Sequence, residues 1–321
     1  MNQSASAPVI RVGISSCLLG QEVRFDGGHK RDAFINRVLS EHFEFVPYCP
    51  EVAIGLGVPR DPIRLERRDG DIRVVGVRQP GLDVTQPLGD YGREVARADP
   101  GISGYILKSK SPTCGMERVK VYDAASGIPA ADGVGEFARS LMEQWPELPV
   151  EEEGRLNDPV LRENFIERVF TYRRWQELVG TGETAAGIVE FHTRHKLLIM
   201  SHSQKAYREL GRMVADCGTG ESRAFGARYI SALMAALRIR ATRKNHANVL
   251  QHVQGYLKDH IDGEDKQELN EVIETYRLGR VPLVVPITLL NHHFRRHPDE
   301  YMQRQYYLNP HPPELMLRNL I

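Results

Sequence analysis

Three cysteines of this chain have a sequence context that suggests shared chemistry. Cys17 follows the segment IRVGIS, Cys49 follows FEFVPY, and Cys114 comes shortly after GYILKS. The apolar and β-branched residues of these segments predict β-strands. If the strands lie parallel, their carboxyl ends meet at one edge of the sheet, where open α/β sheets place their ligands. We therefore expect the three thiols to converge on a metal centre with one open coordination position.

The cysteines could also have different roles. A lone cysteine is often a small apolar core residue. Structural zinc sites favour cysteine pairs about two to four residues apart, and the chain has no such pair, although His29 could supply a nitrogen ligand. Ligation by thiolates alone suits an iron–sulfur cluster better. With three cysteines, one iron of a [4Fe-4S] cluster stays open and can act as a Lewis acid toward a substrate sulfur or oxygen. Cys217 has no partner motif, and we expect it to be a thiol at a helix end.

Polar residues beside the cysteines could take part in the reaction. Glu51 lies two residues after Cys49 and is a candidate general acid or base beside the metal. Ser109 and Ser111 precede Cys114 in the segment LKSKSPTCG, where a hydroxyl could orient a water molecule. The alternatives are a capping carboxylate and ordinary hydrogen bonding within a loop.

The N-terminal half has the pattern of an α/β domain. A strand over 9–16, a helix over 30–42 and a strand over 43–48 form a βαβ unit, whose crossover favours parallel pairing. A long loop over 50–82 is expected to contain a short strand over 72–77. The remaining expected elements are helices over 88–98 and 135–145 and strands over 104–109 and within 148–156.

From residue 157 onward the pattern becomes helical. Residues 159–179 are amphipathic, with Asp158 as the expected N-cap and Pro159 at the first helical position. Further helices are expected over 184–216, 222–239, 242–261, 264–278 and 286–303. The predicted organisation is an α/β domain with a mostly parallel sheet and flanking helices over 1–155, a linker helix over 156–184, and an all-α domain over 185–321.

Composition excludes several classes of protein. The apolar runs are too short for the roughly 20 residues of a membrane-spanning helix, and the segment MNQSASAP does not resemble a secretory signal. Four cysteines in 321 residues are too few for a disulfide scaffold. We therefore expect a cytoplasmic protein that does not bind membranes.

The charge is unevenly distributed. Residues 160–321 contain 23 Lys and Arg against 18 Asp and Glu, although the whole chain has a net charge of zero. The basic residues of this half cluster in RIRATRKNH, TRHK and HHFRRH. Such clusters are commonly solvated helix faces, but they also suit a surface that binds a polyanion.

Several ordered motifs of the N-terminal half resemble the thiouracil desulfurase (TudS) family. They are SSCLLG, VRFDG, CPE, LGVPRDPIRL and KSKSPTCG, and the resemblance covers roughly residues 9–150. It implies a [4Fe-4S] cluster held by Cys17, Cys49 and Cys114, a catalytic carboxylate at Glu51, and a catalytic serine. Ser109 is the preferred match for that serine, with Ser111 as the alternative.

The C-terminal half resembles the YbgA-type domain that is fused behind some desulfurase domains. The matching segments are RHKLLIMSHSQKAY, NHANVLQHVQGYLK, VPLVVPITLLNHHFRRHP and QRQYYLNPHPPE. This fusion implies removal of sulfur from 4-thiouridine in tRNA, which suits a basic C-terminal surface. We expect RNA contacts from Arg238, Arg240, Arg243, Lys244, His292, His293, Arg295 and Arg296.

The leading hypothesis is therefore an iron–sulfur tRNA 4-thiouridine desulfidase that yields uridine and hydrosulfide without net redox change. A desulfurase of free thiouracil or thio-nucleotides is the nearest alternative. A non-enzymatic iron–sulfur sensor that binds RNA is a third, although a sensor needs no acid or base beside its cluster. Activity on RNA should fall steeply with salt, whereas activity on a free base should not.

Overall fold

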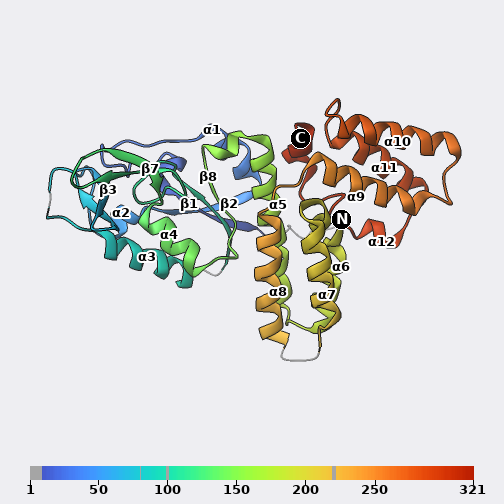
Figure 1. The fold of residues 1–321 in the computed structure, drawn as a ribbon, viewed down its shortest axis with the longest axis horizontal. Coiled ribbons are helices and arrows are strands. Elements are labelled where there is room, and N and C mark those ends of the chain that lie inside the picture. Colours follow the sequence, from blue (N-terminus) through green and yellow to red (C-terminus); the bar gives the residue numbers. More distant parts are fainter. Residues whose placement is uncertain (1–8, 80, 99–100, 219–221) are drawn as a thin grey trace, which may run out of the picture. The chain divides into compact units, whose positions relative to one another are not determined.

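The computed structural model describes residues 9–79, 81–98, 101–218 and 222–321. It divides into two compact units, Met1–Asn157 and Asp158–Ile321 (Figure 1). Among the described residues, the first unit combines strands and helices and the second contains helices without strands. The predicted fold class is confirmed.

A parallel sheet forms the centre of the first unit. Its strand order is β2-β1-β5-β8, and each neighbouring pair is parallel. Because β1 lies between β2 and β5, the ends of these three strands are neighbours at one edge. Gly13 of β1 is required by close packing, since a Cβ there would lie 2.4 Å from the ring of Tyr105. The strands are β1 (Ile10–Ser15), β2 (Phe43–Tyr48), β5 (Ile102–Leu107) and β8 (Val150–Glu152).

A second, mixed sheet was largely absent from the predicted elements. Its order is β4-β3-β6-β7, with β3 and β6 parallel and the outer pairs antiparallel. The first two strands form a hairpin through Asp69 and Gly70, which both have positive φ, as such tight turns require. Only the strand over 72–77 was expected. The strands are β3 (Ile63–Arg68), β4 (Asp71–Gly76), β6 (Val119–Asp123) and β7 (Pro129–Gly133).

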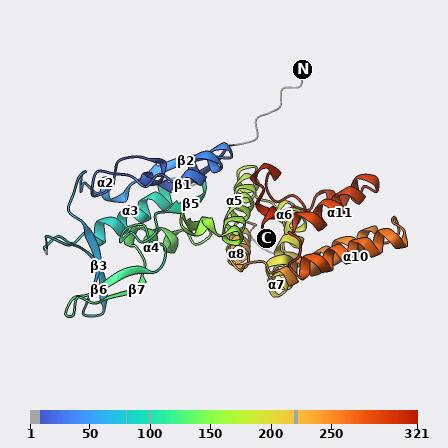
Figure 2. The same cartoon turned by 90° about the horizontal axis from the view of Figure 1, so that it is seen from above.

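Helices α3 and α4 lie side by side in the first unit (Figures 1 and 2). Their close approach depends on Gly92, where a Cβ would lie 2.7 Å from the carbonyl oxygen of Phe137. The predicted helix over 30–42 is instead α1 followed by a short 3-10 turn over 39–41. The helices are α1 (Ala33–Arg37), α2 (Pro50–Ala53), α3 (Thr85–Ala98) and α4 (Glu136–Gln144), with a 3-10 turn η1 at Ser16–Leu19.

The second unit begins with the long helix α5, which contacts α6 and α8. The segment expected to be a linker, 156–184, thus falls almost wholly within this unit. Asp158 caps α5 as expected, because its side chain accepts from the backbone N–H groups of Val160 and Leu161. The helices are α5 (Pro159–Gly180), α6 (Ala185–His202), α7 (Gln204–Ala215), α8 (Ser222–Leu237), α9 (Arg243–Gln254), α10 (Gly263–Arg277), α11 (Val284–Arg296) and α12 (Glu300–Gln303).

Two predicted helices are broken in the structure. Ser203 separates α6 from α7, and its hydroxyl accepts from the N–H of Ala206, which makes it the N-cap of the second helix. Pro298 follows the end of α11, and Asp299 caps α12. Within the described ranges, no helix combines the length and the apolar character needed to cross a membrane.

Candidate active site

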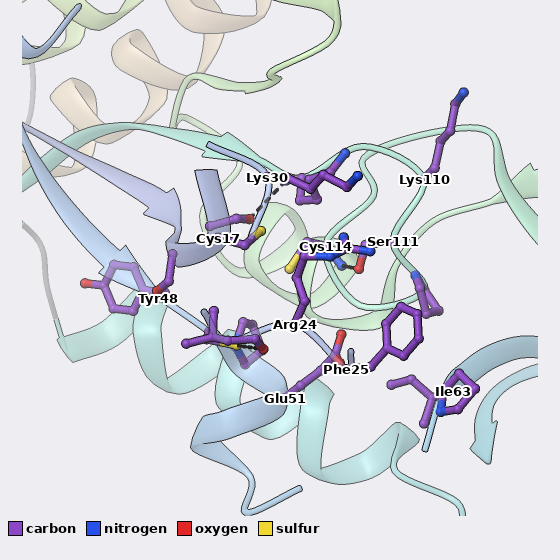
Figure 3. A pocket seen from close by; sticks show the side chains of 18 of the residues that line it. Cys17, Arg24, Phe25, Lys30, Tyr48, Glu51, Ile63, Lys110, Ser111 and Cys114 are labelled. Atoms are coloured by element: carbon purple, nitrogen blue, oxygen red, sulfur yellow. Dashed lines mark hydrogen bonds between the residues drawn. The ribbon is translucent and has the colours of Figure 1, made fainter. Parts of the chain in front are cut away.

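The three cysteines converge as the strand pattern predicted. Cys17 lies in η1 directly after β1, Cys49 is the N-cap of α2 directly after β2, and Cys114 lies on the loop after β5. All three line one cavity of 340 Å³ at the carboxyl edge of the parallel sheet (Figure 3). This edge lies where the strand order reverses around β1, the position at which open α/β sheets bind ligands.

Burial strongly affects the acidity of these thiols. It is the largest influence on each of them, and it raises the pKa of Cys17 to about 11 and the pKa values of Cys49 and Cys114 above their usual range. Lys108 and Arg24 oppose this effect at Cys17 by favouring the thiolate. The thiols therefore carry protons at neutral pH, and binding a metal would release those protons.

The donor set suits an iron–sulfur cluster. Three thiols from three strand ends share one cavity, and the cations Lys108 and Arg24 partly balance their thiolate charge. The nitrogen ligand considered for zinc, His29, is exposed, and its Nδ1 accepts from the N–H of Arg31. Among the described residues, no three His, Cys, Asp or Glu side chains are placed to hold a single metal ion. The cysteines of a cluster bind different irons, so they need not meet at one point.

Glu51 lines the same cavity from the first turn of α2. Its Oε2 accepts from Nε of Arg60 at 2.8 Å, and its Oε1 accepts from Oγ1 of Thr113 at 2.8 Å. The Arg60 guanidinium also donates to the carbonyl oxygens of Gly57 and Val23. These contacts hold the carboxylate in a fixed orientation. Figure 3 shows Glu51 lining the same cavity as Cys17 and Cys114.

Ser109 also lines the cavity, within a network of charged groups. Its hydroxyl donates to Oε1 of Glu153 at 2.8 Å, and its backbone N–H donates to Oε2 of the same residue at 2.7 Å. Lys108 donates to the hydroxyl of Ser109 at 3.1 Å and forms an ion pair with Glu153. The hydroxyl is thus oriented by two charged neighbours.

Ser111 has a different position in the loop. Its hydroxyl oxygen accepts from the N–H groups of Thr113 at 3.2 Å and Cys114 at 3.0 Å. This arrangement holds the turn that presents Cys114 to the cavity. The same turn docks on the start of α4, and a Cβ on Gly135 would lie 2.5 Å from the backbone of Thr113. Ser111 therefore supports the position of Cys114 directly.

Sequence reasoning missed three residues that shape the site. Arg60 and Thr113 hold Glu51, and Glu153 holds Ser109 and Lys108. All three were visible in conspicuous segments: Arg60 in LGVPRDPIRL, Thr113 in KSKSPTCG and Glu153 in the run of three glutamates after Val150. Thr113 and Glu153 have partners distant in the chain, and no spacing rule pairs Arg60 with Glu51.

The residues expected to contact RNA lie in the second unit and, with one exception, are exposed. Arg238 and Arg240 follow α8, Arg243 and Lys244 begin α9, and three of the remaining four are exposed on α11: His292, Arg295 and Arg296. The exception is His293, which is 3% exposed and therefore does not reach the surface where RNA would bind.

Cys217 lies outside the cavity, in the second unit. It follows the end of α7, and its thiol lies 3.8 Å from the carbonyl oxygen of Ala185. This position agrees with the helix-end thiol that was expected.

Two family models match the chain. Residues 12–153 match a family described as 2-thiouracil desulfurase, and residues 196–312 match DUF1722, described as a protein of unknown function. The second match covers much of the helical unit, and the first covers nearly all of the unit that contains the cavity.

Relatives in two bacteria each match part of the chain. The uncharacterized protein YbgA of Escherichia coli (strain K12) is 33% identical over 153 residues, which cover 47% of this chain and 90% of YbgA. The uncharacterized protein YbbK of Bacillus subtilis (strain 168) is 32% identical over 113 residues, which cover 32% of this chain and 71% of YbbK.

One solved structure is also similar, and it is described as the [4Fe-4S]-dependent thiouracil desulfidase TudS. It is 30% identical, with 46% of this chain and 94% of that chain covered and a TM-score of 0.38. From the family models and the two bacterial relatives, the chain belongs to the 2-thiouracil desulfurase family through its N-terminal unit and to the DUF1722 family through its helical unit.

Proposed function

We propose that this protein removes sulfur from 4-thiouridine in tRNA, using a [4Fe-4S] cluster held by Cys17, Cys49 and Cys114. The observation that carries the proposal is the convergence of these three thiols and Glu51 in one cavity of a desulfurase-family domain. When bound, such a cluster would offer a Lewis-acidic iron with an open position to the soft sulfur of a thiocarbonyl group.

The overall reaction is a hydrolytic substitution at C4 of the pyrimidine. The C4–S bond breaks, a C4–O bond forms with an oxygen from water, and hydrosulfide leaves. No electrons are gained or lost in the balance. The protein must therefore move protons and exclude competing reactions, and its polar residues in the cavity serve those needs.

Glu51 is placed to take a proton from the attacking water at its carboxylate oxygens. Arg60 and Thr113 fix the orientation of the carboxylate, so it need not reorganise during the reaction. Ser109, oriented by Glu153 and Lys108, retains a lone pair that can accept a hydrogen bond from a water molecule in the cavity.

The tRNA substrate is supported by the composition of the second unit. Seven of the eight residues expected to contact RNA are exposed cations or histidines. Such residues suit phosphate contacts that position a nucleic acid without reading its sequence. The fusion of a DUF1722 segment to a desulfurase domain gives the chain a surface that a free base would not need.

A free thiobase is the second candidate substrate. The family model that matches the first unit is described as 2-thiouracil desulfurase, and 2-thiouracil is a free base. Both candidates require the same chemistry at the cysteines, and they differ in what lies beyond the base.

Salt dependence separates the two candidates. Cluster-loaded protein would be assayed anaerobically with tRNA containing 4-thiouridine and with free 2-thiouracil, at several salt concentrations. For the tRNA substrate we expect a higher kcat/KM that falls steeply with salt, and for the free base a rate that hardly changes. Turnover of thiouracil with no turnover of tRNA would reject the tRNA proposal and favour the second candidate.

A further inference from the structure

A second hollow opens beside the active-site cavity in the first unit. It has a volume of 590 Å³ and shares Ile63, Lys110 and Pro112 with the cavity that holds the cysteines. The two hollows are therefore adjacent, with these three residues at their common border. The second one is formed by strands β3, β6 and β7 and by the loop after β5.

The charged residues that line this hollow are basic. They are Arg64, Lys110, Arg118 and Lys120, and none of the described residues in its lining is acidic. Lys110, Arg118 and Lys120 are exposed, and Arg64 forms an ion pair with Glu66. We call this hollow, with its four cations and Tyr122, the basic groove.

An aromatic ring and an apolar floor complete the basic groove. The guanidinium of Arg64 lies 5.0 Å from the ring centre of Tyr122, and Leu65 and Val119 provide apolar surface. Cations beside an aromatic ring are the combination with which proteins hold a nucleic-acid backbone and stack a neighbouring base. An acidic protein segment would use the cations but has no comparable use for the ring.

Two of the cations are held by an unusual backbone. Lys110 and Arg118 have φ values of 60° and 53°, in the left-handed region that residues with a Cβ rarely adopt. Such conformations persist where the surrounding structure enforces them and are frequent at functional sites. Here they present cations at the two turns that border the groove.

From these features we infer that the basic groove binds the RNA nucleotides that flank the thiolated base, so that the desulfurase unit itself holds part of the polynucleotide. This inference rests on the proposed function and adds a contact surface outside the helical unit. A nucleotide whose base enters the cysteine cavity carries phosphates on both sides, and the groove begins where that cavity ends. A free thiobase would leave the groove empty.

The test removes two groove cations that lie outside the cysteine cavity. The variant Arg118→Gln/Lys120→Gln would be compared with Arg37→Gln/Arg97→Gln, which removes two exposed cations elsewhere in the first unit. Both would be made in the full chain. Each would be assayed with tRNA containing 4-thiouridine and with 4-thiouridine nucleoside, and tRNA binding would be measured across a range of salt concentrations.

We expect the groove variant to lose about 10-fold in kcat/KM on tRNA and nothing on the nucleoside. The slope of log affinity against log salt should become shallower by about 1 to 2, because two phosphate contacts are lost. The control variant should match the wild type in kcat/KM on tRNA and in the salt slope of tRNA binding. Unchanged activity on the nucleoside would also show that the groove variant folds.

The inference is overturned if the groove variant and the control have the same activity on tRNA and the same salt slope. If the wild type does not desulfurise tRNA at all, the proposed function fails instead. The salt slope of tRNA binding then still decides whether the groove holds RNA, because that measurement requires no turnover.

Discussion

The two units each contain a cluster of buried ionisable groups. The acidic groups of one cluster are paired with basic groups, and the groups of the other are three thiols that burial keeps protonated. In the helical unit, Arg318 donates from Nε to Glu163 at 2.9 Å, and Nε2 of His202 lies 2.5 Å from Oε1 of Glu167. Each buried carboxyl group of this cluster thus has a basic partner within the protein. In the α/β unit, burial is the largest influence on the three thiols and raises the pKa of each, so the fold disfavours their thiolate forms.

This difference indicates what each cluster is for. A network in which buried acidic groups pair with basic ones serves to hold helices together. A set of converging thiols that burial keeps protonated becomes favourable only when a metal group replaces the protons. The first arrangement is a structural element, and the second is prepared to receive a cofactor.

The largest effect on iron binding and activity is expected from removing one of the three cavity thiols. Cys49→Ala leaves only two ligands, so we expect loss of bound iron and a fall in activity of about 10³-fold or more. Iron and sulfide content and anaerobic desulfidase activity measure both effects. Cys217→Ala is the matched control, because this thiol lies outside the cavity, and it should retain iron and activity. Equal iron content in the two variants would contradict the ligand assignment.

Glu51→Gln keeps the size of the side chain and removes its basicity. We expect kcat to fall by about 10²- to 10⁴-fold, the usual contribution of a general acid or base, while iron content stays at the wild-type level. Glu143→Gln, which removes a carboxylate that pairs with Arg139 outside the cavity and the basic groove, is the control. A wild-type kcat in the Glu51→Gln variant would remove this carboxylate from the mechanism.

Arg318→Leu tests the matched cluster of the helical unit. It leaves the buried Glu163 without its basic partner and Glu167 with His202 alone, which should cost about 3–5 kcal/mol in the free energy of unfolding. In a Trp145→Phe background, the fluorescence of Trp175 in α5 reports urea unfolding of this unit. The control Arg277→Leu removes a cation from an exposed ion pair and should unfold close to the wild-type midpoint. Desulfidase activity on 2-thiouracil should survive both changes.

The last prediction is a pH dependence of the stability of the helical unit. Burial lowers the pKa of His192 and His311 to about 4, of His246 to about 3, and of His195 well below its usual range, from 6.5 in the unfolded chain. Between pH 6.5 and 4.5 the unfolded chain therefore binds more protons at these four sites, and stability falls as the pH is lowered. Glu163, whose pKa is raised to about 7 mainly by burial, binds its proton in the folded state and offsets one of the four.

The net difference of three protons corresponds to about 4 kcal/mol of stability lost per pH unit over this range. The same Trp175 fluorescence measures it. His192→Gln should reduce the dependence of the unfolding free energy on pH by the equivalent of one proton. His252→Gln, at an exposed position, should leave that dependence unchanged. A wild-type stability that is flat between pH 6.5 and 4.5 would contradict the account of the buried histidines.

The sequence predicted the convergence of the cysteines for a physical reason. Each cysteine follows a strand with buried side chains, and parallel strands bring their carboxyl ends to one edge. Helix α5 was equally predictable, because Asp158 and Pro159 mark its start locally. Features that depend on neighbours in the chain could be derived from residue types and spacing.

Features that depend on distant contacts could not be derived in this way. Glu51 pairs with Arg60 and with Thr113, which is 62 residues away in the sequence. Strand β3 was missed because Arg64 and Arg68 give it a charged appearance, although both pair with the buried Glu66. His293 looked like a surface residue in a basic run, and only the packing of α11 shows that it is buried.

The most direct test of the central claim is a nucleoside count after anaerobic reaction. Cluster-loaded wild-type protein and Cys114→Ala protein would each be incubated with tRNA containing 4-thiouridine, and the tRNA would be digested to nucleosides. The account predicts that wild type yields one uridine and one hydrosulfide for each 4-thiouridine lost, and that the variant yields neither. Intact 4-thiouridine after incubation with iron-replete wild-type protein, or equal loss with the variant, would contradict it.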